Sequence, residues 1–210
     1  MSKSAWQLLG DYLKDTQLLG SIQSTLYWDQ NTSMPIAGST WRGEQLSLLA
    51  KQLHTRQSCE EFELLIKEAK SELQNLKEKD GFESELMKDR FKNIELLEQD
   101  FNRQKRLDPK LVVELATAKS EGYMCWHEAK KNNDFKSFSP ALKKLISLRT
   151  EQSKQLCEER SCWETLAQPF EPNLTINRVR ELFEPLKKRL PELINTVSYT
   201  HLTLPTIYSV

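Results

Sequence analysis

Scarce glycine and histidine narrow the functions that this sequence can encode. Its 210 residues include six glycines and three histidines. Neither a glycine-rich phosphate-binding loop nor a Gly-x-Ser-x-Gly nucleophile motif occurs. Phosphoryl transfer and serine hydrolysis therefore lack their usual sequence signatures.

Cysteine is also sparse, and its spacing matches no metal-binding or redox motif. Cys59, Cys125, Cys157 and Cys162 form no Cys-x-x-Cys pair, which argues against a zinc knuckle and against a disulfide framework. Because Cys125 and Cys157 lie in apolar helical stretches, we expect buried small hydrophobes there rather than nucleophiles.

The chain carries no excess of either charge and no long apolar run. Its 30 basic and 30 acidic residues cancel, so charge gives no general attraction to nucleic acid or to an anionic membrane. Asp11 and Asp15 fall where a signal peptide would have its apolar core. We expect a cytoplasmic protein that binds neither nucleic acid nor a membrane.

Apolar residues recur at helical spacing along most of the chain, which predicts an all-α fold made of antiparallel helical hairpins. Ser39 or Thr40 is expected to cap the second helix, Asp108 with Pro109 to begin the fifth, and Thr175 to cap the last. The expected helices are 5–28, 39–54, 60–80, 81–102, 108–131, 139–157 and 175–196.

The end of the chain has a different composition. No Asp, Glu, Lys or Arg follows Glu192, and the stretch "VSYTHLTLPTIYSV" favours extended backbone. A docking strand is one interpretation, and a non-native end produced by a frameshift or by joined sequence is the other. We favour the second because the change falls within a helix. The chain thus divides into a helical portion, 1–196, and an atypical tail, 197–210, predicted to be non-helical or disordered.

One segment of the sequence partly matches a metal-binding motif. A metalloprotease motif needs two histidines four residues apart with a glutamate after the first, whereas "HEAKK" at 127–131 has Lys131 in the second position. His127 and Glu128 are therefore interpreted as a partly exposed pair on a helix. His54 is placed near a helix C-terminus, and His201 falls in the tail. No catalytic, cofactor-binding or metal-binding residue is assigned.

The tryptophans could act as stacking platforms, but no basic residues cluster around them. We therefore expect core packing. The four concerned are Trp28, Trp41, Trp126 and Trp163.

One corner of the chain carries a family resemblance. The segment "YWDQNTSMPIAGSTWRGEQLSLLAKQLH", residues 27–54, resembles the N-terminal segment of the carboxypeptidase Taq family, and residues 125–156 and 170–190 resemble later segments in the same order. The resemblance runs from about residue 5 to 195. The matching residues of the first segment are Trp28, Asp29, Met34, Pro35, Arg42 and His54. We expect Trp28 and Met34 to anchor this turn and Asp29 to cap a helix or pair with Arg42.

The resemblance implies a helical metallocarboxypeptidase that releases C-terminal residues from peptides. In the full-length family it implies zinc or cobalt held by H-E-x-x-H and a later glutamate, with peptide substrates and a homodimer as partners. These 210 residues contain no H-E-x-x-H motif. We therefore expect them to form the N-terminal part of the fold, to wall one side of a substrate cleft, and to bind no metal and be inactive alone.

Two alternatives stay open. The chain could be a non-catalytic helical interaction module that uses residues 60–107 as a coiled-coil arm. It could also be a separate enzyme built around Glu121, His127 and Glu128, which share roughly one helix face.

Overall fold

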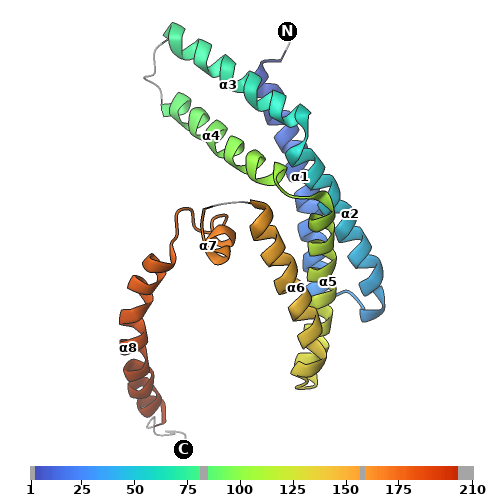
Figure 1. Ribbon diagram of the computed structural model, residues 1–210, viewed down its shortest axis with the longest axis vertical. Helices are drawn as coiled ribbons and strands as arrows, with labels where there is room; N and C mark the ends of the chain where they lie inside the picture. The colour runs from blue at the N-terminus through green and yellow to red at the C-terminus, as the bar shows by residue number, and fades with distance from the viewer. Residues whose placement is uncertain (1–2, 81–84, 157–158, 203–210) are drawn as a thin grey trace, which may run out of the picture. The chain divides into compact units, whose positions relative to one another are not determined.

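The computed structural model describes residues 3–80, 85–156 and 159–202, and every regular element within those ranges is helical (Figure 1). The chain divides into two compact units, residues 1–157 and 158–210, which are described separately below. No helix in the described ranges is long and apolar enough to cross a membrane. The elements are α1 (Ala5–Thr32), the 3-10 turn η1 (Ile36–Gly38), α2 (Ser39–Ser58), α3 (Glu60–Asp80), α4 (Glu85–Lys105), α5 (Pro109–Lys131), α6 (Phe135–Leu156), α7 (Cys162–Ala167) and α8 (Ile176–Leu202).

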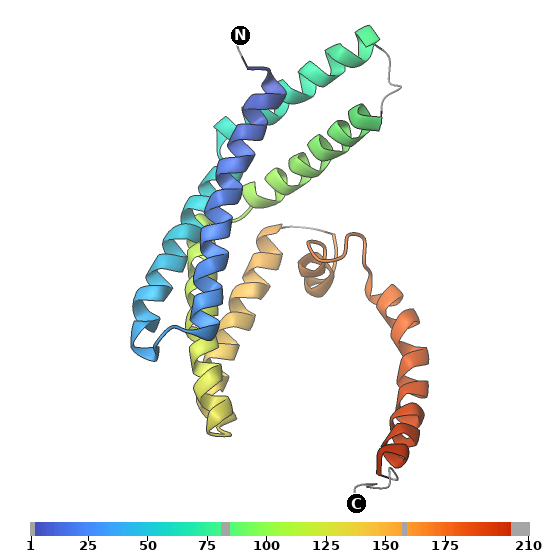
Figure 2. The same ribbon diagram turned by 180° about the vertical axis from the view of Figure 1, so that it is seen from behind.

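The first unit is a set of antiparallel helical hairpins, as predicted. In Figures 1 and 2, α1 and α2 lie side by side with opposite directions, and α3 continues the course of α2 beyond Cys59. The extended backbone of Cys59 (φ −80°, ψ 160°) separates these two helices. The chain returns through α4 and α5, and α6 then runs back along α5. The expected hairpin within residues 60–102 is thus confirmed as α3 and α4.

A hydrophobic core joins α1, α3 and α4. Aromatic rings contribute to it: the ring centroids of Tyr12 and Phe62 lie 5.3 Å apart in a stacked arrangement, and Phe62 meets Phe101 edge to face at 6.0 Å. Because α3 packs against α1 as well as against α4, the two helices do not form an isolated coiled-coil arm. The buried core residues are Leu9, Phe62, Ile66, Ala69, Leu73, Ile94 and Phe101.

Small residues allow α2 and α5 to approach closely. Gly43 is buried, and a Cβ added there would lie 4.0 Å from Oγ of Ser120. One turn further along, the hydroxyls of Ser47 and Thr117 hydrogen-bond at 2.7 Å. The buried Gln30 of α1 completes this crossing, because its side chain donates to the Ser120 carbonyl oxygen at 3.3 Å and accepts from the Ser120 hydroxyl at 3.2 Å. The Gln30 amide therefore provides a hydrogen-bond partner for both the carbonyl oxygen and the hydroxyl of Ser120.

Several predicted helix boundaries are wrong, three of them at the ends of α1 and α2 and at the start of α6. The first helix extends to Thr32, four residues beyond the expected end at Trp28. α2 continues to Ser58 instead of ending near His54. α6 begins at Phe135, so that Pro140 lies inside the helix. Its first turn uses Asp134 instead of Ser139, since an Asp134 carboxylate oxygen accepts from the Ser137 amide at 3.2 Å.

Two of the predicted helix caps are confirmed and one is wrong. Asp108 caps α5 through a 2.7 Å bond from the Lys110 amide, and Thr175 caps α8 through a 3.2 Å bond from the Arg178 amide, so both predictions are confirmed. Neither Ser39 nor Thr40 caps α2, whose N-cap is Gly38 without a side-chain hydrogen bond. The preceding turn η1 leads directly into this helix, which leaves no extended residue at the boundary for a side-chain cap.

The second unit contains α7 and α8. A capping box opens α7: the Ser161 hydroxyl accepts from the Glu164 amide, and the Glu164 carboxylate accepts from the Ser161 amide. α8 continues as a helix to Leu202. The expectation of non-helical chain from residue 197 is therefore wrong for 197–202, where the helix already formed overrides strand propensity. Residues 203–210 lie outside the described ranges.

Candidate functional site

The residues that could have formed a separate active site do not converge. Nδ1 of His127 lies 3.8 Å from Oε1 of Glu128, its neighbour in sequence. Glu121 instead faces Lys144 of α6, with 3.5 Å between the charged atoms. Within the described ranges, no three His, Cys, Asp or Glu side chains gather as metal ligands would. The geometry does not support an enzyme built around these three residues.

The metal implied by the resemblance does not fit the residues present. H-E-x-x-H places two imidazoles on one helical face, but Lys131 stands four residues after His127. A lysine ammonium there would repel a divalent cation rather than bind it. The other histidine with a described side chain, His54, lies on α2 rather than on α5.

The predicted corner between α1 and α2 forms, held by one arginine. Nη2 of Arg42 lies 2.6 Å from Oδ2 of Asp29, Nη1 donates to the carbonyl oxygen of Leu26, and Nε donates to the Gln45 side chain at 3.0 Å. The Arg42 side chain is 11% exposed. The expected pairing of Asp29 with Arg42 is thus confirmed.

The tryptophans and Cys125 contradict the prediction of core packing. Trp28 and Trp41 are 64% and 68% exposed, and Trp126 and Trp163 also lie at the surface. Cys125 is exposed, whereas Cys157 lies outside the described ranges. Helical spacing shows which face a residue occupies, but only a packing partner buries it, and no described segment covers these rings.

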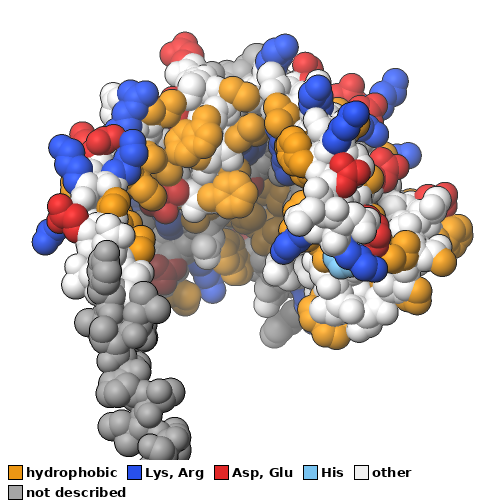
Figure 3. Space-filling view, turned by 90° about the horizontal axis from the view of Figure 1, so that it is seen from below, with side chains coloured by type: hydrophobic (Ala, Val, Ile, Leu, Met, Phe, Trp, Pro, Cys, Tyr) orange, Lys and Arg blue, Asp and Glu red, His pale blue; other side chains and the backbone are white. Residues whose placement is uncertain are grey.

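Other large apolar side chains are exposed in the same manner. Figure 3 shows hydrophobic side chains at the surface between charged ones. On α8 they recur at helical spacing and form a continuous stripe. The exposed members are Leu182, Phe183, Leu186, Leu190, Leu193, Ile194 and Val197.

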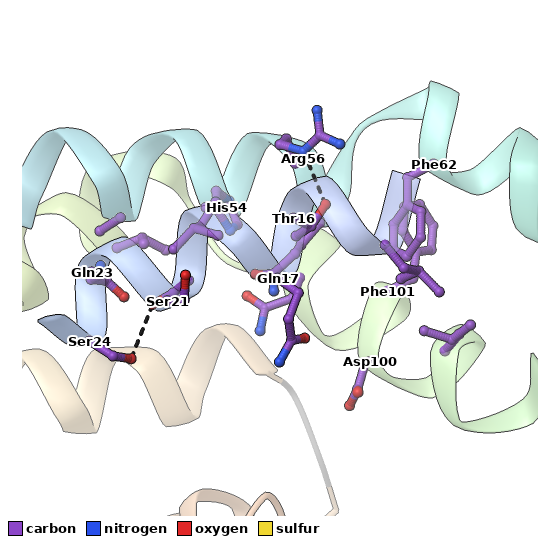
Figure 4. Close-up of a pocket in the computed structure, with 18 residues that line it drawn as sticks. Thr16, Gln17, Ser21, Gln23, Ser24, His54, Arg56, Phe62, Asp100 and Phe101 are labelled. Atoms are coloured by element: carbon purple, nitrogen blue, oxygen red, sulfur yellow. Dashed lines mark hydrogen bonds between the residues drawn. The ribbon is translucent and has the colours of Figure 1, made fainter. Parts of the chain in front are cut away.

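The first unit contains a groove of about 1080 Å³ between α1, α2 and α4 (Figure 4). His54 lies at one part of it, Phe62 and Phe101 at another, and Thr16 and Arg56 between them. Its apolar surface comes from Leu13, Ala50, Leu53, Phe62, Leu97, Phe101 and Val112, and its polar side chains are Thr16, Gln17, Ser21, Gln23, Ser24, His54, Arg56, Gln57, Asp100 and Gln104.

The wall of this groove contains a buried polar atom without a partner. His54 is 3% exposed, and no described residue hydrogen-bonds its Nδ1 atom. A buried polar atom in this state costs free energy unless a ligand or water satisfies it. The helical spacing places His54 correctly on α2, but the sequence alone does not reveal the groove.

Known proteins share this architecture. Residues 8–208 match the family model described as carboxypeptidase Taq (M32) metallopeptidase. The thermostable carboxypeptidase 1 of Thermus thermophilus is 27% identical over 205 residues, which make up 93% of this chain and 38% of that protein. The protein of the same name from Pyrococcus furiosus is 28% identical over 191 residues, 91% of this chain and 36% of that protein.

Solved structures agree with these matches. The crystal structure of BsuCP superimposes with a TM-score of 0.81 at 25% identity, over 92% of this chain and 37% of that one. The M32 carboxypeptidase of Deinococcus radiodurans gives a TM-score of 0.71 at 25% identity, over 93% of this chain and 37% of that one. The chain therefore spans a little over a third of the length of these relatives.

Proposed function

Because this chain belongs to the carboxypeptidase Taq (M32) metallopeptidase family, we propose that it supplies the helical N-terminal part of a metal-dependent carboxypeptidase. Such an enzyme would remove residues from the C-terminal ends of peptides. Two observations carry the proposal: the family model matches residues 8–208, and the alignment with the Thermus relative covers only 38% of that protein. The chain would wall one side of the peptide cleft and contribute no reacting group.

The side chains present agree with the proposal that this chain contributes no metal ligand. Zinc or cobalt would be held by an H-E-x-x-H motif and a later glutamate, neither of which this chain supplies, and the described His127 and Glu128 do not fit that role. We therefore propose that the 210 residues alone bind no catalytic metal and release no amino acids. A homodimer and a cytoplasmic location stay predictions from the resemblance and from the sequence.

The first experiment determines the reading frame of the source DNA beyond codon 196. A frame that continues from α8 into H-E-x-x-H would support the proposal and would identify residues 197–210 as non-native. That tail interpretation stays a prediction, although α8 and the family match both extend past residue 196. A confirmed tail and stop codon would leave the interaction module as the better alternative.

The second experiment tests the purified chain directly. Equilibrium dialysis against zinc and cobalt should find no stoichiometric binding, and mass spectrometry should find peptides with free C-termini unshortened. The His127→Ala variant serves as the control, since weak zinc binding through that exposed imidazole should be lost in the variant. One equivalent of metal per chain together with peptide shortening would contradict the proposal.

A further inference from the structure

Four glutamine side chains line the groove without a hydrogen bond to another described side chain. Gln23, Gln57 and Gln104 are half-buried, come from α1, α2 and α4 respectively, and no side-chain hydrogen bond joins any of them to another described residue. Gln17 of α1 is exposed at the same groove and also makes no such bond. Each amide carries two N–H donors and one carbonyl acceptor, so the groove presents both kinds of hydrogen-bonding group on three sides.

The groove carries one charged side chain of each sign, Arg56 and Asp100, so its lining has no net charge. Arg56 stays charged, but two of its donors bond within the first unit: Nε donates to the Thr16 hydroxyl at 3.0 Å and Nη2 to the Tyr12 carbonyl oxygen at 3.1 Å. The remaining charged side chain in the lining is Asp100. A phosphate or a strongly acidic ligand would meet the carboxylate of Asp100 as well as the guanidinium of Arg56, so the lining offers it no net attraction. The lining instead suits an uncharged ligand that has both donors and acceptors.

The polar groups alternate with an apolar surface. Leu53 and Phe101 line the groove beside the amides, and His54 places its unpaired Nδ1 within the same wall. An extended peptide has this combination: main-chain N–H and C=O groups at regular intervals, with side chains between them. The buried imidazole and the apolar surface together distinguish this groove from an ordinary solvated helix face.

A glycine keeps the groove open. Gly20 of α1 lines it, and a Cβ added there would meet nothing within 4 Å. A larger side chain at this position could therefore occupy the groove without displacing the helix. Gly10, on the same helix but outside the groove lining, is equally unobstructed.

From these observations we propose that the groove between α1, α2 and α4 binds the main chain of an extended, uncharged peptide segment, with the half-buried glutamines and His54 as its hydrogen-bonding partners. This inference rests on the proposed function and deepens it, because it assigns the interior of the peptide, rather than its C-terminal carboxylate, to this wall. Selectivity would favour segments rich in apolar and neutral polar side chains over acidic ones.

The test uses the 210-residue chain and a fluorescein-labelled peptide composed of Ala, Leu, Ser and Gln, followed by fluorescence anisotropy. The free-acid and C-terminal amide forms should bind alike, within about twofold, because the groove recognises internal main chain. A version with N-methylated internal amides should bind at least about tenfold more weakly, since its donors are missing. No saturable binding, a strong preference for the free acid, or indifference to N-methylation would overturn the proposal.

Gly20→Leu and Gly10→Leu form a matched pair. Both replace a helical glycine by a better helix former, so both should retain the helical circular dichroism spectrum and raise the Tm. Only Gly20→Leu should weaken peptide binding, by about tenfold or more. Equal affinities in the two variants would exclude this groove as the binding site. His54→Phe should reproduce the loss, because the proposal makes that imidazole a hydrogen-bonding partner, and unchanged affinity would contradict that role.

The outcomes separate this inference from the proposed function. If the chain binds no metal, shortens no peptide and also fails to bind the probe, only the proposal of a peptide-binding groove is contradicted. Stoichiometric metal binding with peptide shortening would contradict the proposed function, whatever the anisotropy shows.

Discussion

Tyr12 and Arg56 bond reciprocally across the α1–α2 pair. The Tyr12 hydroxyl donates to the Arg56 carbonyl oxygen at 2.9 Å, Arg56 Nη2 donates to the Tyr12 carbonyl oxygen at 3.1 Å, and the guanidinium carbon lies 4.1 Å from the centroid of the Tyr12 ring. The Tyr12 ring also stacks on Phe62. Burial, reinforced by a contact with Cys59, raises the pKa of Tyr12. This pair links the C-terminal end of α2 to the aromatic core.

Tyr12→Phe should lower the free energy of unfolding by about 1–2 kcal/mol, because the Arg56 carbonyl oxygen loses its hydroxyl donor. Denaturant unfolding measures this change. Tyr27→Phe is the matched control: Tyr27 is half-buried, but no described residue hydrogen-bonds its hydroxyl, so a change below about 0.5 kcal/mol is expected. Equal losses in the two variants would show that the ring environment, not the reciprocal bond, determines the effect.

Arg42→Lys should destabilise the first unit by about 1–3 kcal/mol although the charge is retained. The planar guanidinium donates to Asp29, Leu26 and Gln45 at the same time, and a lysine ammonium cannot reach all three acceptors. Thermal and denaturant unfolding measure the loss. Arg178→Lys replaces an arginine in an exposed pair with Glu181 and should change stability by less than about 0.5 kcal/mol. A neutral Arg42→Lys variant would mean that the corner is held by packing alone.

Glu63 should contribute an acid-sensitive component to stability. Its carboxylate accepts from Lys105 at 2.8 Å and from Lys67 at 2.7 Å, and these bonds lower the pKa of Glu63 from 4.5 to about 2. A lowered folded-state pKa gives stabilisation that is complete above 4.5 and lost as the pH falls toward about 2.

Glu63→Gln should therefore lower the Tm at about pH 6, and the difference from the unmodified chain should shrink as the pH approaches about 2. Glu68→Gln provides the control on the same helix, because Glu68 is exposed and forms no ion pair with a described residue. A difference that grows on acidification would contradict the assigned partners. Added salt should reduce the effect, since both lysine partners are exposed.

Gly43 should tolerate one methyl group but not a large side chain. Its Cβ position lies 4.0 Å from the Ser120 hydroxyl oxygen, which is ordinary contact distance. Gly43→Ala should be neutral or stabilising by up to about 1 kcal/mol through helix propensity. Gly43→Leu should destabilise by about 1–3 kcal/mol through overpacking of α2 against α5, whereas Gly10→Leu should not. Similar effects of leucine at the two glycines would rule out a close crossing.

The apolar stripe of α8 should make the isolated chain bind a hydrophobic dye. Leu186, Leu190 and Leu193 are 45%, 43% and 57% exposed, and such contiguous surfaces are normally covered by a partner or by another part of the fold. Replacing all three by Gln should reduce dye fluorescence and concentration-dependent association. The unmodified chain unfolding as a monomer without dye binding would contradict an uncovered stripe.

Periodicity and capping chemistry predicted the helices because both depend on residues within a few positions of one another. Asp108 and Thr175 are correct for this reason, and the overlooked capping box at Ser161 and Glu164 carries the same local signal. Proline was less informative than expected, since Pro140 lies within α6. The Asp134 carboxylate accepts a hydrogen bond from the Ser137 amide in the first turn and thereby determines where that helix begins.

The groove and the exposed tryptophans could not be predicted in this way. Gln17, Gln57 and Gln104 come together only because three helices pack, and their sequence separations carry no periodic signal. Trp28 and Trp41 illustrate the converse case: each occupies a helix, but the pattern contains no information on what covers its ring. The pairing of Asp29 with Arg42 was accessible because a short corner brings the ends of α1 and α2 together.

The close crossing of α2 and α5 has a consequence for synthesis on the ribosome. Ser47 and Thr117, which hydrogen-bond across this crossing, are separated by 70 residues. At translation rates of about 5–20 residues per second, the face of α2 around Gly43 would wait roughly 4–14 seconds for α5 to be made. During that interval α1 can already lie against α2, so nascent chains should expose one side of this hairpin and become a target for chaperones that recognise apolar helices.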